Sequence, residues 1–166
     1  MIGAYALAAH HYVRATADLD LAAVTSLPDL QQLKNVIEEH GYRAKLNFPD
    51  EADPLGGVLA IWVREDEDGD PIEPVEIVNF LNPYRPRKTP ASDAIRRAIP
   101  LLEKPALRYV QLADLIAMKL DAGGPADVVD VMRLLEKNPT ADREEIRATC
   151  KRYGFDIIDT LIAEAS

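Results

Sequence analysis

One short run of the chain alternates apolar and polar residues as a half-buried β-strand requires. Between Val13 and Leu21 every odd position is apolar, and the even positions carry Arg14, Thr16, Asp18 and Asp20. Side chains alternate between the faces of a strand, so these four polar groups are expected on one face, with the two carboxylates about 7 Å apart. Strands are poor in aspartate, and the pair therefore indicates a function, for which binding of a hard divalent cation is the best candidate.

Composition limits the classes of protein to which this chain can belong. Its 166 residues fit one domain with a small helical appendage, and a content of 48% hydrophobic and 28% charged residues is typical of a soluble globular protein. The net charge of −9 argues against a nonspecific nucleic-acid binder. The single cysteine, Cys150, suits a reducing cytoplasm. No apolar stretch is long enough for a membrane span and the first residues lack a signal peptide's positive charge, so we expect a cytoplasmic protein.

The order of expected elements predicts an α+β fold, with a strand-rich part followed by helices. A small mixed β-sheet with helices on one face is expected over residues 1–110, and a C-terminal helical region packed on it over 111–166. Periodicity and turn residues predict strands at 43–48, 57–64, 72–80 and 107–110. They predict helices at 5–11, 26–41, 92–98, 112–122, 125–137, 142–152 and 156–165.

Glu76 is the candidate for a third carboxylate. It interrupts an apolar strand between Val75 and Ile77, where an acid without a partner is rare. If this strand neighbours the one with Asp18 and Asp20, three carboxylates converge, and two of them 4 Å apart repel by about 4 kcal/mol at an effective dielectric constant near 20. Such a cluster requires a cation or a raised pKa.

Gly3 supplies a candidate phosphate-binding element. It directly precedes the first expected helix, and a glycine there lets backbone N–H groups approach an anion that the helix N-terminus also favours. One helix and one strand join Gly3 to Asp18, so the two elements are expected to face the same cleft.

These residues resemble the nucleotidyltransferase fold of the DNA polymerase beta superfamily. The shared pattern is Ile2-Gly-Ala4, a helix, the double-aspartate strand and a later carboxylate. The form Arg14-Ala-Thr-Ala-Asp-Leu-Asp-Leu21 is similar to the bacterial AbiEii-like branch, which includes toxins of toxin–antitoxin pairs. That branch also has a late Leu-x-x-x-Lys-Leu helix and an Asp-x-x-Asp helix, here Leu115–Leu120 and Asp127–Asp130. The resemblance covers about residues 1–135.

The resemblance implies a role for each site residue. Asp18, Asp20 and Glu76 would bind Mg²⁺, with Mn²⁺ as the alternative, and Glu76 would orient or deprotonate the attacking hydroxyl. A nucleoside triphosphate would bind at Gly3 and Ala4, with Arg14, Thr16 and Lys119 as further candidate contacts. The chain departs from the family in having Ala4 for a second Gly or Ser, Glu76 for the more usual Asp, and only two residues before Gly3. An incomplete sheet edge suggests a homodimer or a cognate antitoxin as partner.

Each candidate has a simpler structural explanation. Asp18 and Asp20 fit a solvent-facing strand edge, Glu76 an ion pair with an arginine, and Gly3 a tight turn. Arg14 and Thr16 either contact phosphate or orient the aspartates. Lys119 either forms a salt bridge to Asp127 or Asp130 or reaches the nucleotide. The acidic residues Asp66, Asp68 and Asp70 are assigned to a hairpin turn, and Cys150 to an inert helix position. The basic residues Arg85, Arg87 and Lys88 form either a solvated loop or a site for an anionic acceptor.

The sequence thus leads to one principal function with two competitors. The first is metal-dependent transfer of a nucleoside monophosphate from a nucleoside triphosphate to a protein or RNA hydroxyl, in a toxin–antitoxin setting. The second is a catalytically lapsed nucleotidyltransferase fold that serves as a binding or interaction module. The third is a metal-dependent phosphodiesterase with the same carboxylates.

Overall fold

The computed structural model describes residues 1–165 and confirms the α+β class. The chain divides into two compact units. The sheet unit comprises Ala15–Arg87, and the helical unit comprises Met1–Arg14 with the chain from Lys88 onward. The expected division into residues 1–110 and 111–166 remains a prediction.

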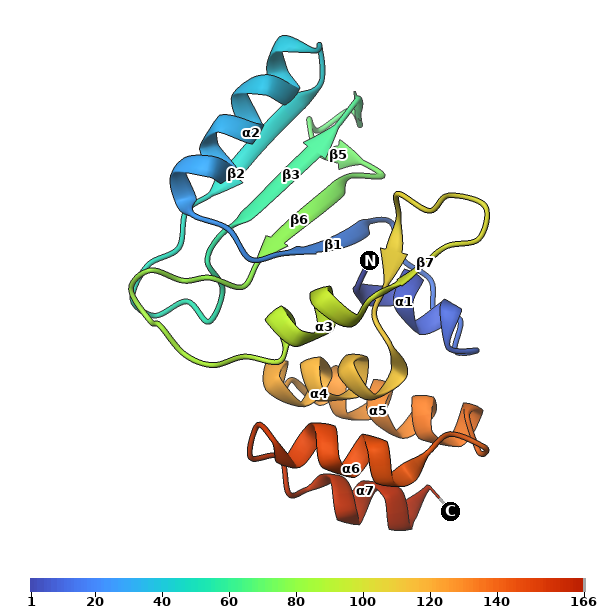
Figure 1. The fold of residues 1–166 in the computed structure, drawn as a ribbon. Helices are drawn as coiled ribbons and strands as arrows, with labels where there is room; N and C mark the ends of the chain where they lie inside the picture. The colour runs from blue at the N-terminus through green and yellow to red at the C-terminus, as the bar shows by residue number, and fades with distance from the viewer. Residues whose placement is uncertain (166) are drawn as a thin grey trace. The chain divides into compact units, whose positions relative to one another are not determined.

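The sheet unit contains a four-stranded mixed sheet in the order β1-β6-β3-β2 (Figure 1). β1 and β6 run parallel, whereas β6, β3 and β2 pair antiparallel. The hairpin at the acidic turn pairs β4 with β5, as expected for Asp66–Asp70. The strands are β1 (Leu19–Ala23), β2 (Arg43–Asn47), β3 (Val58–Trp62), β4 (Arg64–Glu65), β5 (Pro71–Ile72) and β6 (Val75–Asn79).

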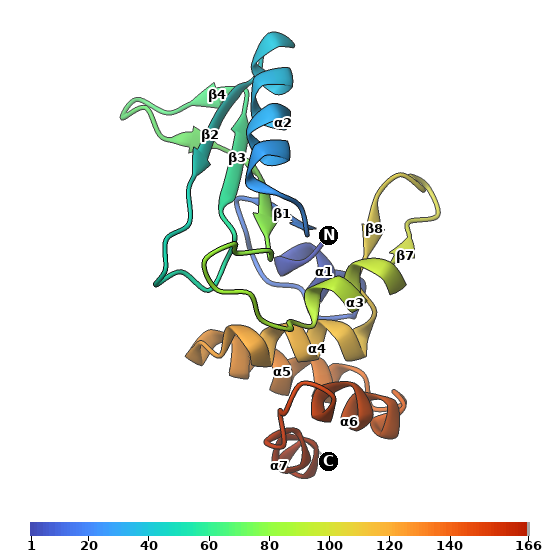
Figure 2. The same ribbon diagram turned by 60° about the vertical axis from the view of Figure 1, so that its left-hand side comes forward.

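Helix α2 (Leu27–Glu39) covers one face of this sheet (Figure 2). Its N-cap is Ser26, whose Oγ accepts a hydrogen bond of 3.2 Å from the N–H of Asp29. The helix ends before Gly41, which has the positive φ of 85° that glycine tolerates best. The core between helix and sheet consists of Leu30, Leu46 and Leu59, with Ile37, Ala44, Ile61 and Ile77 packed around them.

The first strand is shorter than the expected strand over 13–21. β1 begins only at Leu19. Val13, the first apolar residue of the alternating run, is 82% exposed and therefore does not pack on a core. The partner strand explains the boundary. β6 begins at Val75, directly after Pro74, which has no backbone N–H, and Glu73 has a positive φ of 51°. The residues before Leu19 therefore have no partner in β6 with which to continue the hydrogen-bonded pairing of the two strands.

Asn79 is fully buried, and its side chain hydrogen-bonds backbone groups at one end of the sheet. Its Nδ2 donates to the carbonyls of Thr25 and Gly56 at 3.0 Å each, and its Oδ1 accepts from the N–H groups of Thr25 and Leu81 at 3.1 and 3.2 Å. Gly56 leaves room for this arrangement, since a Cβ there would lie 2.1 Å from the Leu81 carbonyl oxygen.

The helical unit packs its N-terminal and C-terminal segments together. Nε2 of His10, which follows the first helix, lies 2.8 Å from the Val110 carbonyl, and Asn138 Nδ2 donates to the His10 carbonyl at 2.8 Å. Cys150 is buried, and burial raises the pKa of its thiol to about 12, in keeping with an inert residue. The elements are α1 (Gly3–Ala9), α3 (Ala91–Arg97), β7 (Ile99–Pro100), β8 (Arg108–Tyr109), α4 (Leu112–Ala122), α5 (Pro125–Lys137), α6 (Arg143–Lys151) and α7 (Ile158–Glu164).

Among residues 1–165, no helix is both long enough and apolar enough to cross a membrane.

We expect Asn79→Ala to lower the free energy of unfolding by about 3 kcal/mol, because it leaves buried backbone donors and acceptors without partners. Urea denaturation followed by circular dichroism measures the loss. Asn35→Ala is the matched control, since Asn35 lies exposed on α2 and its Oδ1 accepts only a surface bond from Gln31. Equal midpoints for the two variants would contradict the role given to Asn79.

Candidate metal and nucleotide site

Three carboxylates of the sheet unit converge where β1 and β6 pair. Asp20 and Glu76 are direct partners in the parallel register, and Asp18 lies in the bend one residue before β1. One carboxylate oxygen from each of the three residues lies within 4.8 Å of the others. Adjacent strands thus bring together residues more than fifty positions apart, and the expectation that Glu76 neighbours the aspartates is confirmed at the level of geometry.

The electrostatics of this cluster favour uptake of positive charge. Partial burial raises the pKa of Glu76, and the nearby negative charges of Asp20 and Asp18 raise it further. All three side chains are half-buried rather than fully solvated. Either a proton or a cation relieves this repulsion, and three carboxylate oxygens at this separation match the oxygen ligands that Mg²⁺ and Mn²⁺ take.

Thr16 and Arg14 occupy different environments and do not share a strand face. The Thr16 hydroxyl hydrogen-bonds a carboxylate oxygen of Asp18, and it accepts a long 3.4 Å contact from the Asp18 N–H. This contact supports the alternative in which Thr16 orients Asp18, and a contact of Thr16 with phosphate remains a prediction. Arg14 belongs to the helical unit, where its Nε lies 3.7 Å from Oδ1 of Asp130.

Gly3 and Ala4 begin the seven-residue helix α1 of the helical unit. Gly3 has a positive φ of 60°, a conformation that glycine adopts without a Cβ penalty. Ala4 is buried in the core, so its side chain is a packing group. A contact between either residue and a nucleotide phosphate remains a prediction.

Lys119 joins α4 to α5 through two ion pairs. Its Nζ lies 2.7 Å from Oδ1 of Asp127 and 2.8 Å from Oδ2 of Asp130, which is almost completely buried. Burial disfavours the charge of Lys119, yet the hydrogen bonds that its ammonium group donates to the two carboxylates outweigh that effect and raise its pKa. The expected interhelical salt bridge is present, and the additional role in nucleotide binding remains a prediction.

The basic loop residues Arg85 and Lys88 have partners within their own units. Nη1 of Arg85 donates to the Ala52 carbonyl at 3.1 Å in the sheet unit, and Lys88 Nζ lies 5.3 Å from the centre of the Tyr153 ring in the helical unit. These contacts order the two side chains without assigning them a ligand.

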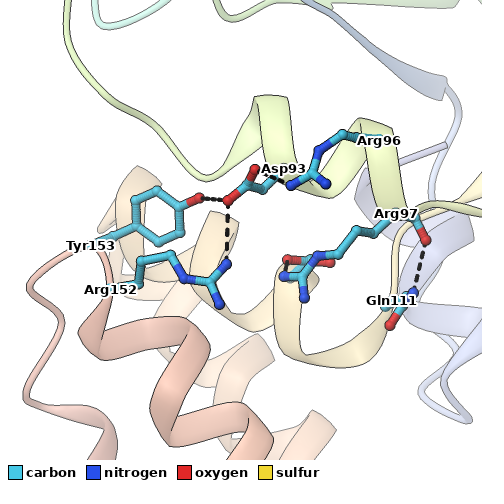
Figure 3. A network of polar contacts seen from close by, with 7 residues as sticks. Asp93, Arg96, Arg97, Gln111, Arg152 and Tyr153 are labelled. Carbon is cyan, nitrogen blue, oxygen red and sulfur yellow. Dashed lines mark hydrogen bonds and ion pairs between the residues drawn. The ribbon is translucent and has the colours of Figure 1, made fainter.

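A second polar network, which the sequence did not reveal, fixes α3 in the helical unit (Figure 3). Asp93 accepts hydrogen bonds from the Tyr153 hydroxyl, Arg96 and Arg152 at 2.6, 2.7 and 3.3 Å, and the first two are the main reason that its pKa is strongly lowered. Arg97 forms an ion pair with the buried Asp114 of α4. Only the spacing of Asp93 and Arg96 is visible in the sequence, because Arg152 and Tyr153 follow the end of α6 and Asp114 lies on α4, all far from α3 along the chain.

Lys119→Met is expected to lower the free energy of unfolding by about 2–3 kcal/mol, because it leaves the buried Asp130 without its closest cation. Lys34→Met provides the control, since the pair of Lys34 with Glu38 lies on the surface of α2 and contributes about 0.5 kcal/mol. Thermal and urea unfolding of both variants measure the difference. Similar losses would show that the Lys119 cluster contributes no more than a surface pair.

Comparison with known proteins gives one family assignment. A family model described as nucleotidyl transferase AbiEii toxin, type IV toxin–antitoxin system, matches residues 1–166. No curated protein sequence matches the chain. Among solved structures, that of the antibiotic-resistance factor ANT(2'')-Ia matches at 18% identity and a TM-score of 0.42, over 98% of this chain and 78% of that chain.

The structural match is too distant to carry an argument, so the assignment depends on the family model and agrees with the resemblance in the sequence. The chain belongs to the AbiEii nucleotidyl transferase toxin family of type IV toxin–antitoxin systems.

Proposed function

We propose that this protein transfers a nucleoside monophosphate from a nucleoside triphosphate to a hydroxyl group of a protein or RNA, with a divalent metal ion as cofactor. The observation that carries the proposal is the convergence of Asp18, Asp20 and Glu76, whose carboxylate oxygens lie within 4.8 Å of one another. Membership of a nucleotidyl transferase family supports the reaction type.

Asp18, Asp20 and Glu76 would hold Mg²⁺, or Mn²⁺ in its place. When bound, the ion would neutralise phosphate charge and orient the reacting oxygens. Thr16 keeps the Asp18 carboxylate in position through its hydroxyl hydrogen bond. Glu76 would orient the acceptor hydroxyl or take its proton, and burial with the nearby carboxylates raises its pKa above the ordinary carboxyl value.

The remaining site residues and partners extend this proposal. Gly3 and Ala4 would contact the triphosphate through backbone N–H groups, and Arg14 and Lys119 would add positive charge. The family setting supports a cognate antitoxin as partner, with a homodimer as the other candidate, and a cytoplasmic location remains a prediction.

Mg²⁺ together with a nonhydrolysable nucleoside triphosphate is expected to raise the melting temperature of the wild-type protein. A ligand at a hundredfold excess over its Kd adds about 2.7 kcal/mol, which corresponds to roughly 5–10 °C for a chain of this size. Differential scanning fluorimetry with each of the four triphosphates measures the shift and identifies the preferred base.

The variant Asp18→Asn with Asp20→Asn should lose this shift, because it removes two of the three proposed ligands. A full shift in that variant would refute the metal assignment. A wild-type protein that responds to none of the four triphosphates would support the lapsed, noncatalytic alternative instead.

Glu76→Gln is expected to stabilise the metal-free protein at neutral pH, because it removes a charge that the folded state disfavours. The pKa of Glu76 is raised above its ordinary value of 4.5 on folding, so the wild-type protein loses stability as the pH rises through 4.5 and the higher folded value. The advantage of Glu76→Gln should therefore be smallest at acidic pH and grow toward neutrality.

Urea denaturation in the presence of a chelator, at several pH values, tests this trend. Addition of Mg²⁺ should then stabilise the wild type more than Glu76→Gln. An advantage that does not change with pH would contradict the electrostatic cause.

A further inference from the structure

The β7–β8 hairpin of the helical unit presents a leucine to solvent in its connecting loop (Figure 2). Leu102 is 99% exposed, more than any other large apolar side chain among residues 1–165. Scattered exposed apolar residues are ordinary on protein surfaces, so the exposure alone assigns no role to Leu102. The support of the loop, the hollow beside it and its charges give Leu102 a specific one.

An ordered support holds the loop that carries Leu102. The N–H of Leu101 donates to the Leu107 carbonyl at 2.9 Å and so closes the loop across the hairpin. The ring of Tyr109, on β8, packs edge-on against His10 with the two ring centres 5.7 Å apart. Because the support is already ordered, burial of Leu102 by a partner would cost little further conformational entropy.

A cavity of about 400 Å³ lies beside Leu102, between the hairpin and the end of α1. Its lining is mostly apolar and includes Ala9, Leu101 and Tyr109, with Leu102 at its rim. The side chain of Leu102 is too exposed to fill this hollow itself. The hairpin therefore presents both halves of an apolar contact, a protruding leucine and a hollow that can receive one.

The two charged residues that line the cavity are of opposite sign. Glu103 and Lys104 are neighbours in the loop, and neither side chain has an ion pair or a hydrogen bond with any residue that the structure describes. Two copies of a chain with a net charge of −9 repel each other over most of their surfaces. At this hairpin the charges balance, and Glu103 of each copy can face Lys104 of the other.

From these features we infer that the β7–β8 hairpin and its cavity form the contact of a two-fold symmetric homodimer. Leu102 of each subunit enters the cavity of the other, and Glu103 pairs with Lys104 across the axis. A two-fold contact requires a surface that complements itself, and one hairpin here supplies the projection, the hollow and one charge of each sign. The inference gives the homodimer, one candidate partner under the proposed function, a definite surface, and it does not depend on the proposed reaction.

An added strand from another protein is the principal alternative partner of this hairpin. Strand addition uses the free backbone N–H groups of a sheet edge, but β7 consists of Ile99 and Pro100, and proline has no N–H. β8 is paired with β7, and the backbone groups next to it are also bonded: the Met1 amino group hydrogen-bonds the Arg108 carbonyl, and the Val110 N–H donates to the Met1 carbonyl at 3.4 Å. Contact through side chains therefore suits the hairpin better than an added strand.

Sedimentation equilibrium of the wild-type protein over a range of concentrations should show a reversible monomer–dimer equilibrium. We expect a Kd in the micromolar range, because one hairpin from each subunit buries less than the roughly 1,600 Å² of a standard interface. A wild type that stays monomeric at its highest soluble concentration would overturn the inference and leave the hairpin to a different partner.

Leu102→Ser should weaken the dimer by about a hundredfold, because the symmetry axis puts the lost leucine in the contact twice. Its melting temperature in dilute solution should stay that of the wild type, since the side chain packs on nothing in the monomer. Val63→Ser removes another strongly exposed apolar side chain, from the sheet unit, and should leave the dimer unchanged. Equal association of Leu102→Ser and wild type would refute the assigned contact.

Ala9→Phe tests the cavity with Leu102 left in place. The larger ring should occupy the hollow and weaken the dimer by about tenfold or more, because the leucine of the partner subunit can no longer enter. Ala9→Ser keeps the position small and is the control. Circular dichroism and a thermal melt check that both variants fold. Unchanged association of a folded Ala9→Phe would show that the cavity does not receive Leu102.

Charge reversal tests the pairing across the axis. Glu103→Lys should weaken the dimer by about tenfold, because each lysine then faces another lysine. Since this substitution makes the net charge less negative, an effect of overall charge would strengthen association instead. Combining it with Lys104→Glu restores opposite charges and the original net charge, and should return the Kd to within about threefold of the wild-type value. A combined variant no better than Glu103→Lys would contradict the pairing.

The variant Asp18→Asn with Asp20→Asn separates this inference from the proposed function. It should form the dimer as the wild type does while losing the melting-temperature shift with Mg²⁺ and nucleoside triphosphate. Leu102→Ser should show the opposite pattern, with a normal shift and little dimer. Loss of the dimer in the aspartate variant would overturn the inference, because it would place the contact at the carboxylates rather than at the hairpin.

Discussion

The parallel pairing of β1 with β6 is the constraint on which the proposed chemistry depends. It puts Asp20 opposite Glu76, while Asp18 lies in the bend directly before β1, and the three carboxylates repel one another in the absence of a cation. Other features of the sheet unit support this pairing. Asn79 fixes the end of β6 through four backbone groups, and α2 covers the far side of the sheet, where Leu59 and Ile77 are packed.

This arrangement destabilises the charged form of Glu76 and thereby raises its pKa. Burial and two neighbouring carboxylates favour its protonated form, so the folded chain is less stable at neutral pH than it would be with a neutral residue there. A site that tolerates repulsion in the free protein gains more when a cation binds.

The helical unit uses charge differently. Lys119 is surrounded by Asp127 and Asp130, and Arg97 lies against Asp114, so opposite charges compensate each other in places where water is scarce. Asp93 accepts hydrogen bonds from Arg96 of its own helix and from Arg152 and Tyr153, which follow the end of α6. These pairs connect helices, whereas the carboxylate cluster of the sheet unit contains charges of one sign. This contrast separates structural ion pairs from a candidate functional site.

Much of the secondary structure was predictable from local patterns. The helices at Leu112–Ala122 and Pro125–Lys137 have the expected bounds, because Gly123, Gly124 and Pro125 determine where one ends and the next begins. The alternation from Val13 was misleading, because alternation shows which residues can share a face but not whether a partner strand extends that far. The candidate carboxylates were also identifiable, since Asp18, Asp20 and Glu76 are unusual residues for their positions.

The sequence by itself determined the α+β class, the bounds of α4 and α5 and the identity of the three acidic residues, since propensities, capping residues and hydrophobic periodicity act over short distances. The first helix was expected at 5–11 but lies two residues earlier, at Gly3–Ala9. Only the tertiary structure decided that Asp20 lies beside Glu76, that Lys119 pairs with two aspartates, and that Lys45 and Trp62 share a face with the carboxylates. Those relations depend on strand order and register, which hydrogen bonding between distant segments sets and no local pattern encodes.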